Sequence, residues 1–102
     1  MMEQSEKDFQ AEVIKLAIKE GWPKEFIYHT YDSRRSRGGF PDLQMIRDDR
    51  LIVAELKKDS IPDDKIPEDQ AAWLEAYSKV TVMSTHLWRP RDMEDIVRRL
   101  AR

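Results

Sequence analysis

The chain contains no cysteine, and this absence excludes disulfide bonds and thiolate zinc sites. Its two histidines, His29 and His86, lie far apart and lack the spacing of metal ligands, so a histidine-rich metal centre is not expected. No apolar run approaches the roughly 20 residues that span a membrane. The N-terminal residues also lack the basic and apolar regions of a signal peptide. We therefore expect a cytoplasmic protein with no membrane partner.

What is present is a highly charged chain with enough apolar residues for one core. Its 102 residues fit a single domain, 1–102, and hydrophobic residues make up 40% of them. Charged residues make up 37%, yet the net charge is only -2. This balance argues against a protein that coats DNA nonspecifically, which would usually be basic. It is compatible with an enzyme that meets DNA over a small patch.

Hydrophobic periodicity predicts an α/β fold with the element order α-β-β-β-α-β-β-α. A tight connection at 48–50 makes the second and third strands an antiparallel hairpin. One mixed central β-sheet flanked by helices is the simplest architecture that buries all the apolar faces. The expected helices cover about 5–20, 67–78 and 92–100, and the expected strands about 25–32, 42–47, 51–57, 80–83 and 86–88.

The hairpin carries an unusual set of polar side chains. Side chains alternate along a strand, so Glu55 and Lys57 share the face that Leu51 and Val53 make apolar. Charged side chains on such a face indicate a specific role, because burying an unpaired charge is energetically costly. Asp42 begins the partner strand, and antiparallel pairing brings it near the level of Glu55 and Lys57. Two carboxylates and a lysine are therefore expected at one end of the sheet.

These oxygen ligands suit Mg²⁺ or Mn²⁺, which keep several waters and bind through one or two carboxylates plus a substrate phosphate. Asp42 and Glu55 would hold the metal, with the backbone carbonyl of Leu56 as a further ligand. Lys57 would orient a water or neutralise developing charge, and Lys58 is a candidate for DNA contact. For the Glu55–Lys57 fragment alone, the alternative is a surface ion pair with Asp42 as a strand cap.

A basic loop that ends in glycine precedes the hairpin. The guanidinium groups of Arg34, Arg35 and Arg37 are suited to binding DNA phosphates near a cleavage site. Gly38 and Gly39 would let the backbone approach a phosphate closely. The alternative is an exposed basic loop with no fixed partner.

Together, Pro41-Asp42 and Glu55-Leu56-Lys57 match the signature of the PD-(D/E)xK nucleases. More closely, the chain resembles the virus-type replication-repair nuclease (VRR-Nuc) family. This resemblance implies a restriction-endonuclease-like core and divalent-metal-dependent phosphodiester hydrolysis. It spans about 12–100 and rests on Glu12, the run Arg37-Gly38-Gly39-Phe40-Pro41-Asp42, Glu55-Leu56-Lys57, Gln70, Trp73, and a Val82 strand followed by Arg89-Pro90 and a helix.

The resemblance also implies roles for two residues outside the hairpin. Gln70 would complete the catalytic site of Asp42, Glu55 and Lys57, and Glu12 would lie at its edge as a metal or water contact. From the residues alone, Glu12 is interpreted as a solvated glutamate at the border of a helix stripe. Gln70 would then simply cap backbone N–H groups.

Resemblance to the stand-alone, phage-like members of this family implies a homodimer that cuts branched DNA such as four-way (Holliday) junctions. If the chain is phage-encoded, it would act in the cytoplasm of a bacterial host cell. One competing hypothesis is a non-catalytic DNA- or protein-binding module with a nuclease-like fold. The intact set of Asp42, Glu55 and Lys57 argues against it. Another is a sequence-specific restriction-type enzyme, which would need added elements to read base edges in the major groove.

Overall fold

The computed structural model describes residues 3–29, 41–81 and 83–101. None of the helices in these ranges is long and apolar enough to cross a membrane. Short 3-10 turns cover Lys24–Phe26, Asp63–Lys65 and Pro90–Asp92. The helices and strands follow the order α1 (Glu6–Lys19), β1 (Ile27–His29), β2 (Leu43–Arg47), β3 (Arg50–Leu56), α2 (Glu68–Ser78), β4 (Ser84–Trp88) and α3 (Met93–Leu100).

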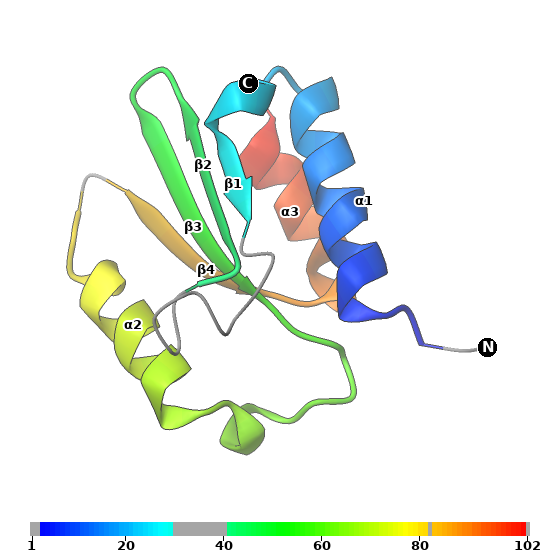
Figure 1. Cartoon of the computed structure of the whole chain (residues 1–102), viewed down its shortest axis with the longest axis vertical. Coiled ribbons are helices and arrows are strands. Elements are labelled where there is room, and N and C mark those ends of the chain that lie inside the picture. The colour runs from blue at the N-terminus through cyan, green and yellow to red at the C-terminus, as the bar shows by residue number, and fades with distance from the viewer. Residues whose placement is uncertain (1–2, 30–40, 82, 102) are drawn as a thin grey trace.

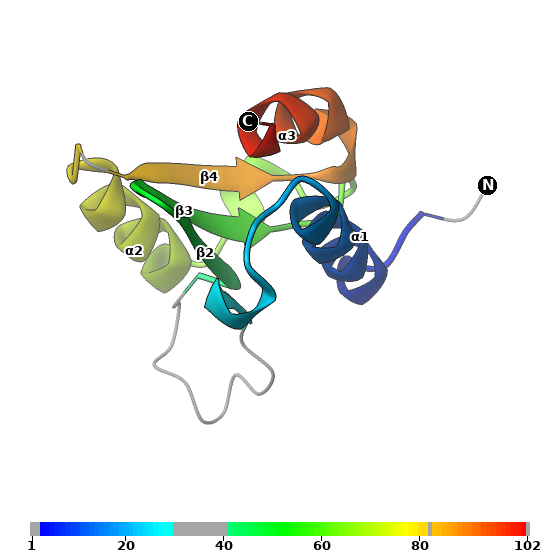
Figure 2. The same cartoon turned by 90° about the horizontal axis from the view of Figure 1, so that it is seen from above.

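The strands of the described residues form one mixed sheet in the order β1-β2-β3-β4 (Figure 1). β2 pairs antiparallel with both β1 and β3, whereas β3 and β4 are parallel. A parallel pair needs a crossover connection, which the chain makes through residues 57–67 and α2. Helices α1 and α3 lie together on one side of the sheet and α2 lies on the other (Figures 1 and 2). The structure confirms the predicted α/β architecture.

Helix α1 shows why the sequence signals at its ends were reliable. The Ser5 hydroxyl accepts a hydrogen bond from the Asp8 backbone N–H at 3.0 Å, which caps the first turn. Gly21 follows the helix with a φ of 101°, a conformation that glycine adopts without a Cβ penalty. Between these ends, one face of the helix is completely buried at Phe9, Val13 and Ala17.

The core lies between one face of the sheet and helices α1 and α3. Strand β3 contributes alternate residues, Ile52, Ala54 and Leu56, to this core. Val53 and Glu55 therefore point to the opposite face, the side of α2, and both are also buried. Because β3 is central, it is covered on both faces, and the acidic side chain of Glu55 is covered with it.

The strand predicted from Glu25 onward was wrong at its start. Residues Lys24–Phe26 form a 3-10 turn, and β1 begins only at Ile27. Pro23 fixes its own φ, and its carbonyl accepts a hydrogen bond from the Phe26 N–H at 3.0 Å, which closes the turn. The expected continuation over 30–32 lies outside the described residues.

The strand predicted at 80–83 was also wrong at the positions that the structure describes. The Val80 N–H donates to the Tyr77 carbonyl at 2.9 Å, so the chain is still turning at the end of α2. Met83 lies in a bend, and Val82 lies outside the described residues. In the described chain between α2 and α3, β4 is therefore the one strand, and the residues at 80, 81 and 83 connect the end of α2 to it.

Candidate active site

Asp42 and Glu55 meet at the open end of the β2–β3 hairpin. The strand register pairs Leu43 with Ala54, and one further step sets Asp42 opposite Glu55. Their side chains continue the hydrogen bonding where the ladder ends. The Asp42 N–H donates to Glu55 Oε1 at 3.2 Å, and the Leu56 N–H donates to Asp42 Oδ2 at 3.0 Å. The hairpin itself therefore fixes this acidic pair, Asp42 and Glu55.

The Glu55 carboxyl is buried without full hydrogen bonding. Its side chain is 1% exposed, and its Oε2 has no hydrogen-bond partner among the described residues. Burial raises the pKa of Glu55 to about 9, and the hydrogen bond and charge of Asp42 add to the rise. The Lys57 charge opposes the rise. Without a cation at the site, Glu55 therefore holds a proton at neutral pH.

Lys57 follows β3 directly and lies beside the acidic pair. Its Nζ is 3.9 Å from Glu55 Oε2, and its side chain is 13% exposed. Its backbone N–H donates to the Trp88 carbonyl at 3.0 Å, which fixes Lys57 against the end of β4. The structure thus brings Asp42, Glu55 and Lys57 together as the sequence pattern predicted.

Gln70 lies in the first turn of α2. Its backbone N–H donates to Asp69 Oδ1 at 2.9 Å. Its side-chain Oε1 is buried and has no hydrogen-bond partner in the described part of the chain. A cap for backbone N–H groups would use this oxygen, so the structure does not support that alternative. The buried oxygen is left available to a ligand or a water.

Glu12 is exposed on α1 and accepts a hydrogen bond from Gln4 Nε2 at 2.7 Å. Within 3–29, 41–81 and 83–101, no three His, Cys, Asp or Glu side chains are grouped so as to hold a metal ion. Glu12 therefore does not join the acidic pair in this structure. Lys58 is half-buried beside the site. The predicted DNA contacts of the basic loop lie outside the described residues: Arg34, Arg35, Arg37, Gly38 and Gly39.

The donor set of the acidic pair fits a divalent cation. Glu55 Oε2 is buried without a hydrogen-bond partner in the described chain, and the Lys57 ammonium at 3.9 Å compensates its charge only in part, so a further positive charge would stabilise it. Asp42, Glu55 and the Leu56 carbonyl offer only hard oxygen atoms, which Mg²⁺ and Mn²⁺ prefer. Two carboxylates leave the remaining coordination positions to waters and to substrate phosphate.

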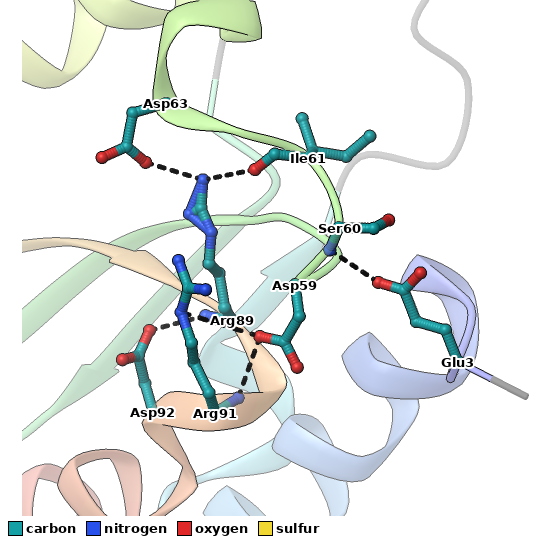
Figure 3. A network of polar contacts seen from close by, with 8 residues as sticks. All are labelled: Glu3, Asp59, Ser60, Ile61, Asp63, Arg89, Arg91 and Asp92. Atoms are coloured by element: carbon teal, nitrogen blue, oxygen red, sulfur yellow. Dashed lines mark hydrogen bonds and ion pairs between the residues drawn. The ribbon is translucent and has the colours of Figure 1, made fainter. Parts of the chain in front are cut away.

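Sequence reasoning gave no role to Arg89, which the structure shows to be buried with 3% of its side chain exposed. The sequence signal was an arginine directly after an apolar strand and directly before Pro90. Its contacts hold the chain that follows Lys57 (Figure 3).

Comparisons with known proteins agree with this description of the fold. No family model matches the sequence, and no curated protein matches it. Among solved structures, a protein described as "VRR_NUC domain protein" is similar with a TM-score of 0.69 and 17% sequence identity. The match covers 98% of this chain and 90% of that chain. The chain thus has the fold of a VRR_NUC domain protein, as the resemblance in its sequence predicted.

Proposed function

We propose that this protein is a Mg²⁺- or Mn²⁺-dependent endodeoxyribonuclease that hydrolyses phosphodiester bonds, with a preference for branched DNA such as four-way junctions. One observation carries the proposal. The half-buried Asp42 and the buried Glu55 form an acidic pair, in which Glu55 Oε2 has no hydrogen-bond partner in the described chain and the Lys57 ammonium lies 3.9 Å from that oxygen. The VRR_NUC fold supports the same activity.

Each side chain of the site has a role in this proposal. Asp42, Glu55 and the Leu56 carbonyl would hold the cation, which when bound would polarise the scissile phosphate and acidify a water. Lys57 orients the attacking water and offsets negative charge that develops on the phosphate oxygens. Gln70 accepts a hydrogen bond from the water through Oε1. Burial of Glu55 strengthens these interactions because the local dielectric is low.

DNA binding in this proposal is the role of Lys58 and of the basic residues that precede Asp42 in the sequence. Lys58 adjoins the site, and phosphate contacts from Arg34, Arg35 and Arg37 would need no base reading. Gly38 and Gly39 would allow the backbone close to a phosphate. Such contacts suit recognition of DNA shape better than recognition of sequence.

Cleavage of a labelled four-way junction, compared with linear duplex and single strand in Mg²⁺ or Mn²⁺, tests the proposal. Asp42→Asn, Glu55→Gln and Lys57→Met should each lower the cleavage rate by about 10²–10³-fold, the usual effect of removing one electrostatic group from a site. Chelation with EDTA should stop the wild type. Lys79→Met is the matched control, since Lys79 Nζ also lies 3.9 Å from a glutamate, Glu75, but both side chains are exposed.

The outcomes separate the parts of the proposal. Equal cutting of all three substrates would retain the nuclease and remove the junction preference. If the wild type binds DNA but cuts none of the substrates with either metal, the protein is a non-catalytic binding module instead.

A homodimer is the assembly that junction cleavage requires in this proposal, because two sites would cut paired strands together. Small-angle scattering of the purified protein should therefore give the mass of two chains. A monomer at high concentration would contradict this part of the proposal and leave the chemistry of the acidic pair intact.

A further inference from the structure

The segment 57–67, called here the linker, joins two parts of the proposed site. It begins with Lys57 beside the acidic pair, and it leads into α2, whose first turn carries Gln70. Its path from β3 to α2 runs outside the sheet, and the 3-10 turn Asp63–Lys65 is its single piece of regular structure. The linker is held by a polar network, called here the Arg89 network, of Glu3, Asp59, Ser60, Ile61, Asp63, Arg89, Arg91 and Asp92 (Figure 3).

The buried guanidinium of Arg89 binds the linker at two points. Arg89 Nη2 donates to the Ile61 carbonyl at 2.8 Å and to Asp63 Oδ1 at 2.8 Å. The Arg89 backbone N–H donates to Asp92 Oδ2 at 2.9 Å, which fixes the turn from which the side chain extends. One nitrogen thus holds two positions of the linker, two residues apart, against the end of β4.

Neighbouring contacts continue the same attachment. The Lys57 N–H donates to the Trp88 carbonyl at 3.0 Å, and the Arg91 N–H donates to Asp59 Oδ1 at 3.2 Å. Positions 57, 59, 61 and 63 of the linker are therefore tied in turn to residues 88–91. The chain between Lys57 and α2 is fastened along its first half.

Stability alone does not account for a buried arginine at this place. Arg89 is 3% exposed, and its Nε has no hydrogen-bond partner among the described residues, so its burial carries a desolvation cost. Its ionic partner Asp63 is 83% exposed and would remain solvated without Arg89. An apolar side chain at this position would leave no buried carboxylate unpaired. What Arg89 adds is a fixed path for the linker.

We propose that Arg89 is a positioning residue of the active site. Through Ile61 and Asp63 it fixes the linker, and the linker in turn fixes the start of α2, and so Gln70, relative to Lys57 and the acidic pair, which the strands hold. This inference rests on the proposed function, because it assigns Arg89 to the same site. Small misplacements of catalytic groups lower rates strongly, so loss of the Arg89 contacts should lower kcat and leave metal binding unchanged.

The first test needs no activity. Amide hydrogen exchange of the metal-free protein, followed by mass spectrometry, should show about tenfold faster exchange over 58–66 in Arg89→Met than in the wild type. Exchange of α1 should not change. Arg98→Met is the control, since Arg98 is exposed and pairs with Asp95 of its own helix. Unchanged exchange over 58–66 in Arg89→Met would overturn the inference.

The second test compares steady-state cleavage of the four-way junction in Mg²⁺. Arg89→Met should lower kcat by roughly ten- to a hundredfold, with KM and the Mg²⁺ half-saturation nearly unchanged, because Asp42 and Glu55 are held by the strands. Arg89→Lys should recover part of kcat, since one ammonium retains a donor for Ile61 or Asp63. Wild-type kcat in Arg89→Met, or an equal fall in Arg98→Met, would overturn the inference.

A matched pair of substitutions on the linker completes the experiment. Asp63→Ala, which removes the acceptor of the Arg89 hydrogen bond, should lower kcat, whereas Asp64→Ala, at the adjacent acidic residue outside the Arg89 network, should not. Equal effects would contradict the role of the Arg89–Asp63 contact. If the wild type cuts no DNA, the proposed function fails, and hydrogen exchange still decides whether Arg89 orders the linker.

Discussion

The side chain of Glu55 lies against Asp42 with 1% of its surface exposed, where its charge is unfavourable unless a cation is bound. Its Oε2 has no hydrogen-bond partner in the described chain, and Lys57 compensates only in part from 3.9 Å. Residues that serve chemistry often weaken the folded protein. The proposed function therefore requires a buried carboxylate at position 55, whereas the metal-free protein would be more stable without that charge.

The pH dependence of stability tests this conflict. The pKa of Glu55 is raised from 4.5 to about 9 in the folded protein, so between these values the folded state holds a proton that the unfolded state releases. Stability in EDTA should therefore fall as pH rises through this window. Glu55→Gln should remove the slope between pH 7 and 9 and raise the free energy of unfolding at pH 8, as measured by urea denaturation.

Two features make this measurement specific to Glu55. Glu75→Gln is the control, since Glu75 is 71% exposed, and it should retain the wild-type slope. His86 has a pKa lowered by burial and by Arg99, so its effect is a loss of stability as pH falls below about 6.5, outside the measured range. The same slope in Glu55→Gln and the wild type would contradict the prediction.

Among the elements, α2 packs least tightly although its sequence is rich in apolar residues. None of its residues is buried, whereas α1 buries three side chains completely. Trp73 and Tyr77 lie one turn apart with ring centroids at 5.9 Å, so they contact each other on a half-buried face. Helix α2 carries Gln70, and the proposed site therefore includes an element with little packing energy of its own.

Hydrogen exchange should reveal this difference. The backbone amides of α2 should exchange through local opening, faster than those of α1 and α3, whose exchange requires opening of the core. Helix α3 is a suitable reference, because Ile96 and Leu100 are completely buried. Equal protection of α1, α2 and α3 in the metal-free protein would contradict the expectation.

Some of these features could be predicted from the sequence and others could not. The acidic pair was predictable because Asp42 and Glu55 lie on one hairpin, where a short turn fixes the register. The turn before β1 and the conformation of the chain at 80–83 were not predictable in this way, since short apolar runs have no distinctive period. The contacts of Arg89 were not predicted, because its partners Ile61 and Asp63 are 28 and 26 positions away, on a linker without periodicity.

At the scale of the whole molecule, the turn of the β2–β3 hairpin closes the end opposite the site. Arg50 donates to the Ala101 carbonyl at 3.0 Å and also to the Arg99 carbonyl, at the C-terminal end of α3. Its guanidinium lies 5.0 Å from the ring of Trp22, whose Nε1 donates to the Leu100 carbonyl at 3.0 Å. Cationic side chains at helix C-termini are favourable for the helix dipole.

Helix α1 is held at the same end of the hairpin. Arg47 Nη1 donates to the Glu20 carbonyl at 2.7 Å, directly after the last turn of α1. The Arg47 guanidinium also lies 6.0 Å from the Trp22 ring. The hairpin turn therefore binds the C-terminal ends of both core helices, while its other end carries the acidic pair.

This separation predicts a substitution that affects stability alone. Arg50→Ala should lower the free energy of unfolding by about 1.5–3 kcal/mol, the range for hydrogen bonds from charged groups. Its kcat should be unchanged at temperatures where the protein is folded. Urea denaturation and junction cleavage measure the two effects, with Arg98→Ala as an exposed control. Reduced kcat without reduced stability would contradict the prediction.

The burial of residues 52–56 of β3 has a consequence for the unfolded chain. The run from Ile52 to Leu56 has no proline and is mostly aliphatic, so in an unfolded molecule it is prone to self-association. Glu55 is the one charge within the run, and such a residue acts as a gatekeeper against aggregation. We therefore expect Glu55→Gln to refold from urea with more precipitate at high concentration, even though its folded form is more stable.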